Sequence, residues 1–141
     1  KGSSFDAETV LARMKKRFDE YLTHLDFSQG DYTFFFPPYS ALYWNYAFGA
    51  GNGETYLEFK AYAERMLLGY ENVRIFDFQN APFITDLNNY KDYTHYAPEI
   101  NDRMLGCFAS GEYLVEEPDS GLERTETQVA ELLERYPQIP E

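Results

Sequence analysis

The chain has 141 residues, of which 24 are acidic and 12 basic, so its formal net charge at pH 7 is −12. This length is typical of a single domain. A negative field of this size repels phosphate backbones and anionic lipid headgroups, so we expect no nucleic-acid partner. No apolar run approaches the roughly 20 residues that cross a bilayer, and residues 1–4 lack the apolar core of a signal peptide. We therefore expect the chain itself to be soluble.

Aromatic residues are unusually frequent, since 13 Tyr, 12 Phe and one Trp make up 18% of the sequence. Two interpretations stay open: the rings form a platform for sugars, or they fill the core of the domain. The single cysteine, Cys107, cannot form an internal disulfide. Its mostly apolar neighbours predict a buried and inert thiol.

The first half of the chain predicts a helix, a strand and a long loop. Apolar residues recur at helical spacing over residues 6–25, and Asp6 is placed to cap that helix. Residues 32–36 are a continuous aromatic and β-branched run, which predicts a strand covered on both faces. Two prolines end this strand. Residues 39–53 contain three glycines and predict a loop with a helical turn near residues 41–46.

The second half alternates helices with one further strand. Residues 54–68 predict a helix ending at Gly69, and residues 73–78 predict a strand. Strand, helix and strand in this order form a crossover unit, so the two strands should be parallel. Pro98 and Gly111 are placed to begin and end another helix, and residues 123–136 predict a last one.

This set of elements predicts an α/β fold, but the sheet is too small to be complete. Two strands and a doubtful third at residues 113–115 are few for a parallel sheet flanked by helices. We infer that residues 1–141 are one C-terminal portion of a larger α/β domain, with residues 121–141 forming a C-terminal helix and a frayed tail. Alternatively, the open sheet edge pairs with another chain as a homodimer.

The loop over residues 79–97 contains the side chains with the clearest chemistry. Reactive groups gather at the carboxyl ends of parallel strands, and this loop leaves the second strand there. Asp92 lies three residues before His95, so its carboxylate can accept a hydrogen bond from the imidazole Nδ1. Nε2 would then face outward as a general base. The alternative is an aspartate that caps a helix, with a histidine in a loop.

The surrounding sequence resembles a known family. Residues 89–101 resemble the C-terminal Asp-x-x-His block of the SGNH (GDSL-like) hydrolases, in particular the bacterial envelope branch with the teichoic-acid D-alanylation protein and the alginate O-acetyltransferases. Residues 34–40 are similar to a mid-sheet strand of such proteins. The resemblance implies a three-layer, flavodoxin-like parallel-sheet fold. It also implies that Asp92 and His95 belong to a Ser-His-Asp triad that needs no cofactor and no metal.

The resemblance further implies a serine esterase or O-acyltransferase that acts on acyl groups of an envelope polysaccharide. An envelope glycan or an acyl donor would be its partner. Such a protein would be extracytoplasmic and anchored to the membrane through an N-terminal segment that is missing here. The nucleophile is not recognisable, because no strand leads into a Gly-x-Ser turn, and Gly2 with Ser3 and Ser4 is a superficial match. We therefore expect the isolated chain to be inactive, unless it pairs with the missing N-terminal half.

Five further residues are candidates for contacting the substrate. Tyr39 and Trp44, together with Tyr43, could stack on a glycan or else cover the sheet edge. Ser40 could contact substrate or be a turn residue. Asn45 is the nearest match to the family's oxyanion Asn, although the Gly-x-Asn pattern is absent and a loop residue is the alternative.

The remaining polar residues predict less specific roles. His24 should lie on a solvated helix face, and no spacing of His and Cys suits zinc. Asp77 and Asp86 are expected to cap turns. A competing hypothesis for the whole chain is a non-catalytic α/β domain that uses its aromatic loop to bind glycan or protein.

Overall fold

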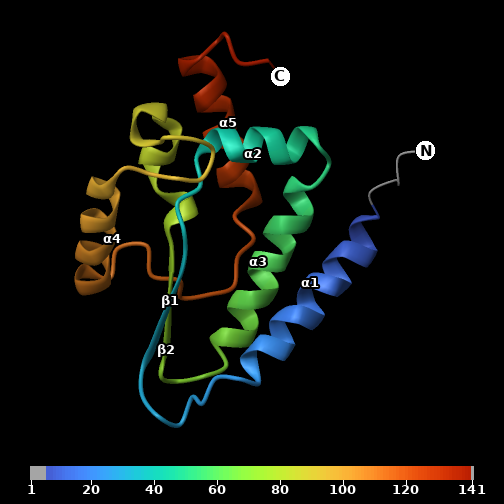
Figure 1. Cartoon of the computed structure of the whole chain (residues 1–141), viewed down its shortest axis with the longest axis vertical. Helices are drawn as coiled ribbons and strands as arrows, with labels where there is room; N and C mark the ends of the chain where they lie inside the picture. The colour runs from blue at the N-terminus through green and yellow to red at the C-terminus, as the bar shows by residue number, and fades with distance from the viewer. Residues whose placement is uncertain (1–5, 141) are drawn as a thin grey trace.

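A computed structural model describes residues 6–140 and shows a mixed α/β fold. Strand β1 (Tyr32–Phe36) pairs with strand β2 (Val73–Asp77) in parallel, with Tyr32 opposite Val73 and Phe36 opposite Asp77. Helices α2 (Ala41–Gly49) and α3 (Gly53–Leu67) connect the two strands (Figure 1). The predicted parallel crossover is confirmed, and both strands have the predicted bounds to within one residue.

Helix α1 (Ala7–Leu22) lies along α3 (Figure 1). Asp6 caps it as predicted, because its carboxylate accepts a hydrogen bond from the Thr9 backbone N–H. The helix ends three residues before the predicted position, so His24 lies just beyond it, exposed to solvent. Phe18 and Leu22 pack against a buried cluster on this side of the sheet, formed by Leu67, Val73 and Ile75.

Helix α4 (Pro98–Ser110) covers the other side of the sheet. Pro98 opens it, and Gly111 ends it in the left-handed conformation at φ 80°, as the sequence predicts. Its apolar face packs on the sheet in a cluster of Phe76, Phe78, Ile100, Met104 and Cys107. Burial raises the pKa of the Cys107 thiol, in agreement with the predicted inert cysteine.

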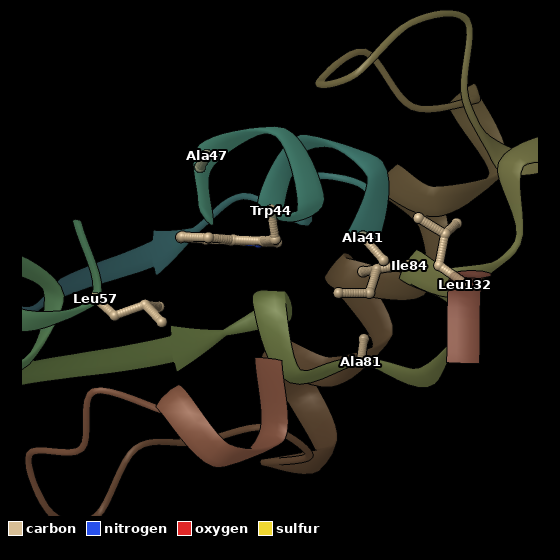
Figure 2. Packing of buried hydrophobic residues seen from close by; sticks show 7 residues of the cluster. All are labelled: Ala41, Trp44, Ala47, Leu57, Ala81, Ile84 and Leu132. Atoms are coloured by element: carbon tan, nitrogen blue, oxygen red, sulfur yellow. The ribbon is translucent and has the colours of Figure 1, made fainter. Parts of the chain in front are cut away.

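The predicted loop over residues 39–53 is wrong, because most of it forms helix α2. Ser40 caps this helix by accepting the Tyr43 backbone N–H. Ala41, Trp44 and Ala47 form its buried face, and they pack with residues from α3, the segment after β2, and the C-terminal helix (Figure 2). That last helix, α5 (Leu122–Arg135), has nearly the predicted bounds.

Strand β1 is the open edge of the sheet within residues 6–140. On the far side of β2, Leu114 forms a single antiparallel bridge with Phe76, so the doubtful third strand is only a bridge. The other edge, along β1, has no partner strand in the described part of the chain. The prediction that β1 is covered on both faces is wrong, since Thr33 is exposed and Phe35 is 43% exposed.

None of the helices in the described range is both long and apolar enough to cross a membrane.

Candidate functional site

Asp92 and His95 lie at the tip of a closed loop after β2. Three short 3₁₀ turns, η1 (Phe78–Asn80), η2 (Pro82–Thr85) and η3 (Leu87–Asn89), lead from β2 to it. We call residues 90–96 the dyad loop. Tyr90 and Tyr96 pair at its base, and the Lys91 N–H donates to the His95 carbonyl at 2.8 Å.

The dyad loop is held over the carboxyl end of β1. The backbone N–H and the hydroxyl of Ser40 both donate to the Tyr93 carbonyl, at 3.0 and 2.7 Å. The Tyr90 hydroxyl donates to the Pro38 carbonyl at 2.7 Å. The loop that leaves β2 is thereby fixed beside the segment that leaves β1, where sites of parallel α/β sheets form.

The Asp92–His95 contact has the predicted geometry. His95 Nδ1 lies 2.7 Å from Asp92 Oδ2 and 2.8 Å from Oδ1. Asp92 Oδ1 also accepts the backbone N–H groups of Thr94 and His95, at 3.0 and 2.9 Å. The pKa of Asp92 is lowered to about 2, mainly by these two backbone hydrogen bonds and further by the imidazole of His95. Asp92 is therefore a carboxylate throughout the physiological range.

The imidazole is open to an approaching group. The His95 side chain is 76% exposed and that of Asp92 48%. Nδ1 is occupied by the carboxylate, and Nε2 forms no hydrogen bond with any of residues 6–140. This arrangement fixes the ring orientation and turns Nε2 outward, so this nitrogen can accept a proton from a reacting group.

The described residues do not place a nucleophile at this imidazole. Ser40 is fully buried, its hydroxyl donates to Tyr93, and its oxygen accepts the Tyr43 N–H, so it serves as a helix cap. Gly2, Ser3 and Ser4 lie outside the described residues. Asn45 is half-buried on α2.

Three of the predicted substrate-contacting residues lie around one cavity. Tyr39 and Trp44, with Tyr43 between them in sequence, line a space of about 380 Å³. Ser40 and Asn45 are not among the residues around this cavity. Trp44 is almost fully buried and also belongs to the core below α2 (Figure 2). For Trp44 the core interpretation is confirmed, and the platform for sugars stays a prediction.

A buried ion pair at the end of β2 was not predicted. Lys60 Nζ lies 2.8 Å from Asp77 Oδ2, and the two side chains are only 3% and 5% exposed. Asp77 also accepts the Gln79 backbone N–H at 3.0 Å and the Asn80 amide at 2.7 Å, so it caps a turn as predicted. One sequence feature could have indicated this pair, because Lys60 lies on the same face of α3 as the apolar Leu57 and Leu67.

Glu64, one turn after Lys60 on α3, is a second buried ionisable residue. Its Oε2 accepts the Asp119 backbone N–H at 2.8 Å. Burial is the main reason that the pKa of Glu64 rises to about 7, and the nearby Asp77 carboxylate adds to the shift. Glu64, Asp77 and Asn80 line a cavity of about 210 Å³ together with residues 113–117, Asp119 and Arg124.

Two exposed tyrosines beside the Asp92–His95 pair were also not predicted. The rings of Tyr46 and Tyr93 stack with centroids 6.0 Å apart at an interplanar angle of 20°. They come from α2 and the dyad loop. A cavity of about 220 Å³ lies next to Tyr93 and Asp92, with Leu42 and Leu87 in its wall.

Over residues 6–140, no group of three or more His, Cys, Asp and Glu side chains is arranged to hold a metal ion. Comparison of the chain with protein-family models, with curated proteins and with solved structures found no match in any of the three.

Proposed function

We propose that this chain supplies the acid–base half of an SGNH-like esterase or acyltransferase site that acts on acyl groups of an envelope polysaccharide. The observation that carries the proposal is the contact of His95 Nδ1 with the Asp92 carboxylate, with the rest of the ring exposed. The location of the dyad loop over the carboxyl end of β1 and the low pKa of Asp92 support it.

In this proposal His95 is the base and Asp92 is its orienting partner. His95 Nε2 removes the proton from a serine hydroxyl while the serine oxygen bonds to the ester carbonyl carbon. When the tetrahedral intermediate collapses, the carbon–oxygen bond to the alcohol breaks. The imidazolium then returns the proton to the departing oxygen. Asp92 remains ionised throughout, which its low pKa permits.

The open edge of β1 offers a route by which the serine reaches His95. The Tyr32 N–H bonds to Asn72 on the β2 side, so the backbone groups of Thr33 and Phe35 point to the open edge. A strand added there in parallel would end beside the dyad loop and deliver its following turn to the imidazole. That strand would come from another part of the same protein or from a second copy.

Because the proposed polymer lies outside the cell membrane, the protein would be held on the outer face by an N-terminal anchor.

A histidine-modification experiment tests whether His95 acts as the base. Diethyl pyrocarbonate acylates an accessible, unprotonated imidazole nitrogen. The chain contains a matched control, because His24 is also exposed and has no carboxylate partner among the described residues. At alkaline pH, where the reagent meets unprotonated rings, the hydrogen bond from Nδ1 to Asp92 makes Nε2 of His95 the stronger nucleophile. Under these conditions we expect His95 to be acylated faster than His24 and this advantage to disappear in Asp92→Asn. Equal rates for the two histidines would contradict the proposal.

Labelling of the longest natural form of the protein tests the complete reaction. A fluorophosphonate probe should label a serine, and His95→Ala should reduce the rate by about 10³-fold or more. His24→Ala should label at the unchanged rate. If no serine is labelled, or if His95→Ala has no effect, the chain is not part of a serine hydrolase site.

A further inference from the structure

The 380 Å³ cavity that contains Trp44 lies at the carboxyl ends of both strands. Phe36 and Pro37 end β1 at its border, and Gln79 follows β2 there. Side chains from α2, α3 and the segment before α2 make its walls largely aromatic, and they include Tyr39, Tyr43, Trp44, Tyr56 and Phe59. A space of this size, apolar and with few polar groups, is typical of a small-ligand pocket.

The uncharged polar side chains around the cavity form no hydrogen bonds with the described residues. Gln79 is only 5% exposed, yet its side-chain amide forms no hydrogen bond with any of residues 6–140. In the same range the hydroxyls of Tyr39, Tyr43 and Tyr56 also form none. The Trp44 indole N–H is buried and has no partner in this part of the chain. Of these groups the Trp44 N–H is fully buried, and a ligand that bonds to it would be stabilised, because an unpaired buried polar group is unfavourable. The phenols and the Gln79 amide keep some exposure and are open to hydrogen bonds with a ligand.

The cavity offers no uncompensated charge. Lys60 is the one charged side chain among the described residues that line it, and Asp77 neutralises it at 2.8 Å. The ring centroids of Tyr39 and Tyr43 lie 4.8 Å apart. The pKa of Tyr43 is raised, mainly by burial and further by Tyr56 and Tyr39, so its phenol stays protonated. With a chain charge of −12, an anionic ligand would be repelled.

We propose that this cavity binds a single neutral pyranose ring. A sugar ring combines apolar C–H faces, which pack on aromatic walls, with several hydroxyls that donate to and accept from the phenols and the Gln79 amide. An alkyl chain would match the walls but would leave these groups unpaired. The inference rests on the proposed function, because a polysaccharide substrate would give sugar binding at this cavity its biological role. Binding itself requires neither His95 nor catalysis.

The chain provides its own probe for this site, because Trp44 is its one tryptophan. The intrinsic fluorescence of the intact chain is titrated with methyl β-D-glucopyranoside, methyl β-D-galactopyranoside and N-acetylglucosamine. We expect a saturable change with at least one sugar, with a Kd on the order of millimolar. Hexan-1-ol is titrated in parallel as an alkyl ligand without a ring of hydroxyls.

Conservative variants assign the binding to the cavity. Gln79→Leu and Tyr56→Phe keep most of the side-chain volume, and each should weaken binding about fivefold, as the loss of one or two hydrogen bonds does. Tyr46→Phe is the matched control, because Tyr46 is an exposed tyrosine on the same helix as Trp44 but is not among the residues around this cavity. His95→Ala should also bind normally, so failure of catalysis and failure of sugar binding are distinguishable.

Three results would overturn the inference. The first is the absence of a saturable response to all three sugars up to roughly 0.1 M. The second is saturation by hexan-1-ol without any response to the sugars, which would identify an alkyl pocket. The third is unchanged sugar affinity in both Gln79→Leu and Tyr56→Phe while circular dichroism shows that the variants are folded.

Discussion

In two places in this molecule a carboxylate contacts a basic side chain at almost the same distance but in opposite surroundings. His95 lies 2.7 Å from Asp92, and these side chains are 76% and 48% exposed. Lys60 lies 2.8 Å from Asp77, and both side chains are more than nine-tenths buried. Water screens the first pair, whereas removing one partner of the second leaves an isolated charge in the core. Burial, and not distance, therefore separates a pair suited to chemistry from a pair that holds the fold.

Removing the buried cation should have the largest effect on stability. In Lys60→Met the Asp77 carboxylate loses its counter-charge, and we expect the free energy of unfolding to fall by about 3–5 kcal/mol in urea titrations. The double variant Lys60→Met, Asp77→Asn should recover much of this loss. Lys16→Met is the control, because Lys16 pairs with Glu20 at 4.0 Å on the exposed face of α1. Equal losses in Lys60→Met and Lys16→Met would contradict the comparison.

Glu64→Gln should change how stability depends on pH. The folded-state pKa of Glu64 is about 7, above the ordinary 4.5, so between these values the folded chain binds more protons than the unfolded chain. Stability from this group is complete below about pH 4.5 and is lost as the pH rises through about 7. At pH 8 the variant should be more stable than the parent by roughly 1–3 kcal/mol, and at pH 4.5 the two should be equal. A constant difference across that range would refute this explanation.

Ser40 connects helix α2 to the dyad loop, and Ser40→Ala should have an intermediate effect on stability. It removes the cap of α2 and the hydroxyl bond to the Tyr93 carbonyl. We expect a loss of about 1 kcal/mol in unfolding experiments, which is typical of a lost helix cap. Backbone amides of residues 91–95 should also exchange faster with deuterium. Ser28→Ala, at an exposed turn, should leave their exchange unchanged.

Asp92→Asn should have the smallest effect on folding and the most specific effect on His95. Because this pair is exposed, we expect only a small fall in the melting temperature at pH 7. In the parent chain the pKa of Asp92 is about 2, below the ordinary 3.8, so its contribution is present above about pH 4 and lost as the pH falls through about 2. NMR signals of the His95 ring should therefore change near pH 2 in the parent and not in the variant. If these NMR signals change near pH 4 instead, the backbone hydrogen bonds do not lower the pKa of Asp92.

The sequence predicts features that depend on nearby residues better than features that depend on distant ones. Asp92 and His95 are three residues apart, so their contact follows from a short turn. Lys60 and Asp77 lie on different elements, and only the folded crossover brings them together. The sequence predicts a loop where helix α2 forms, because the aromatic and glycine residues of this segment are typical of a loop. The helix is nevertheless capped by Ser40 and stabilised by its buried residues Ala41, Trp44 and Ala47. Tertiary packing decides such a segment more than local propensity.

The exposure of β1 also could not be read from its composition. Its aromatic run is typical of a central strand, but an apolar run indicates only that neighbours are expected and not which ones are present. In the structure its side chains alternate between half-buried and exposed. Because side chains of a strand point to the faces of the sheet, the exposure of Thr33 and Phe35 reflects incomplete cover of one face and not the open edge.

The open edge of β1 has a further consequence for how the purified protein should behave. Uncharged Thr33 and Phe35 lie at an edge that can template pairing with a second copy. The formal charge of −12 opposes such contacts by repulsion between copies. That protection weakens as the pH approaches the isoelectric point of about 4.5, or when concentrated salt screens the charges. Mildly alkaline, low-salt buffers should therefore keep the protein dispersed, and acidification should precipitate it.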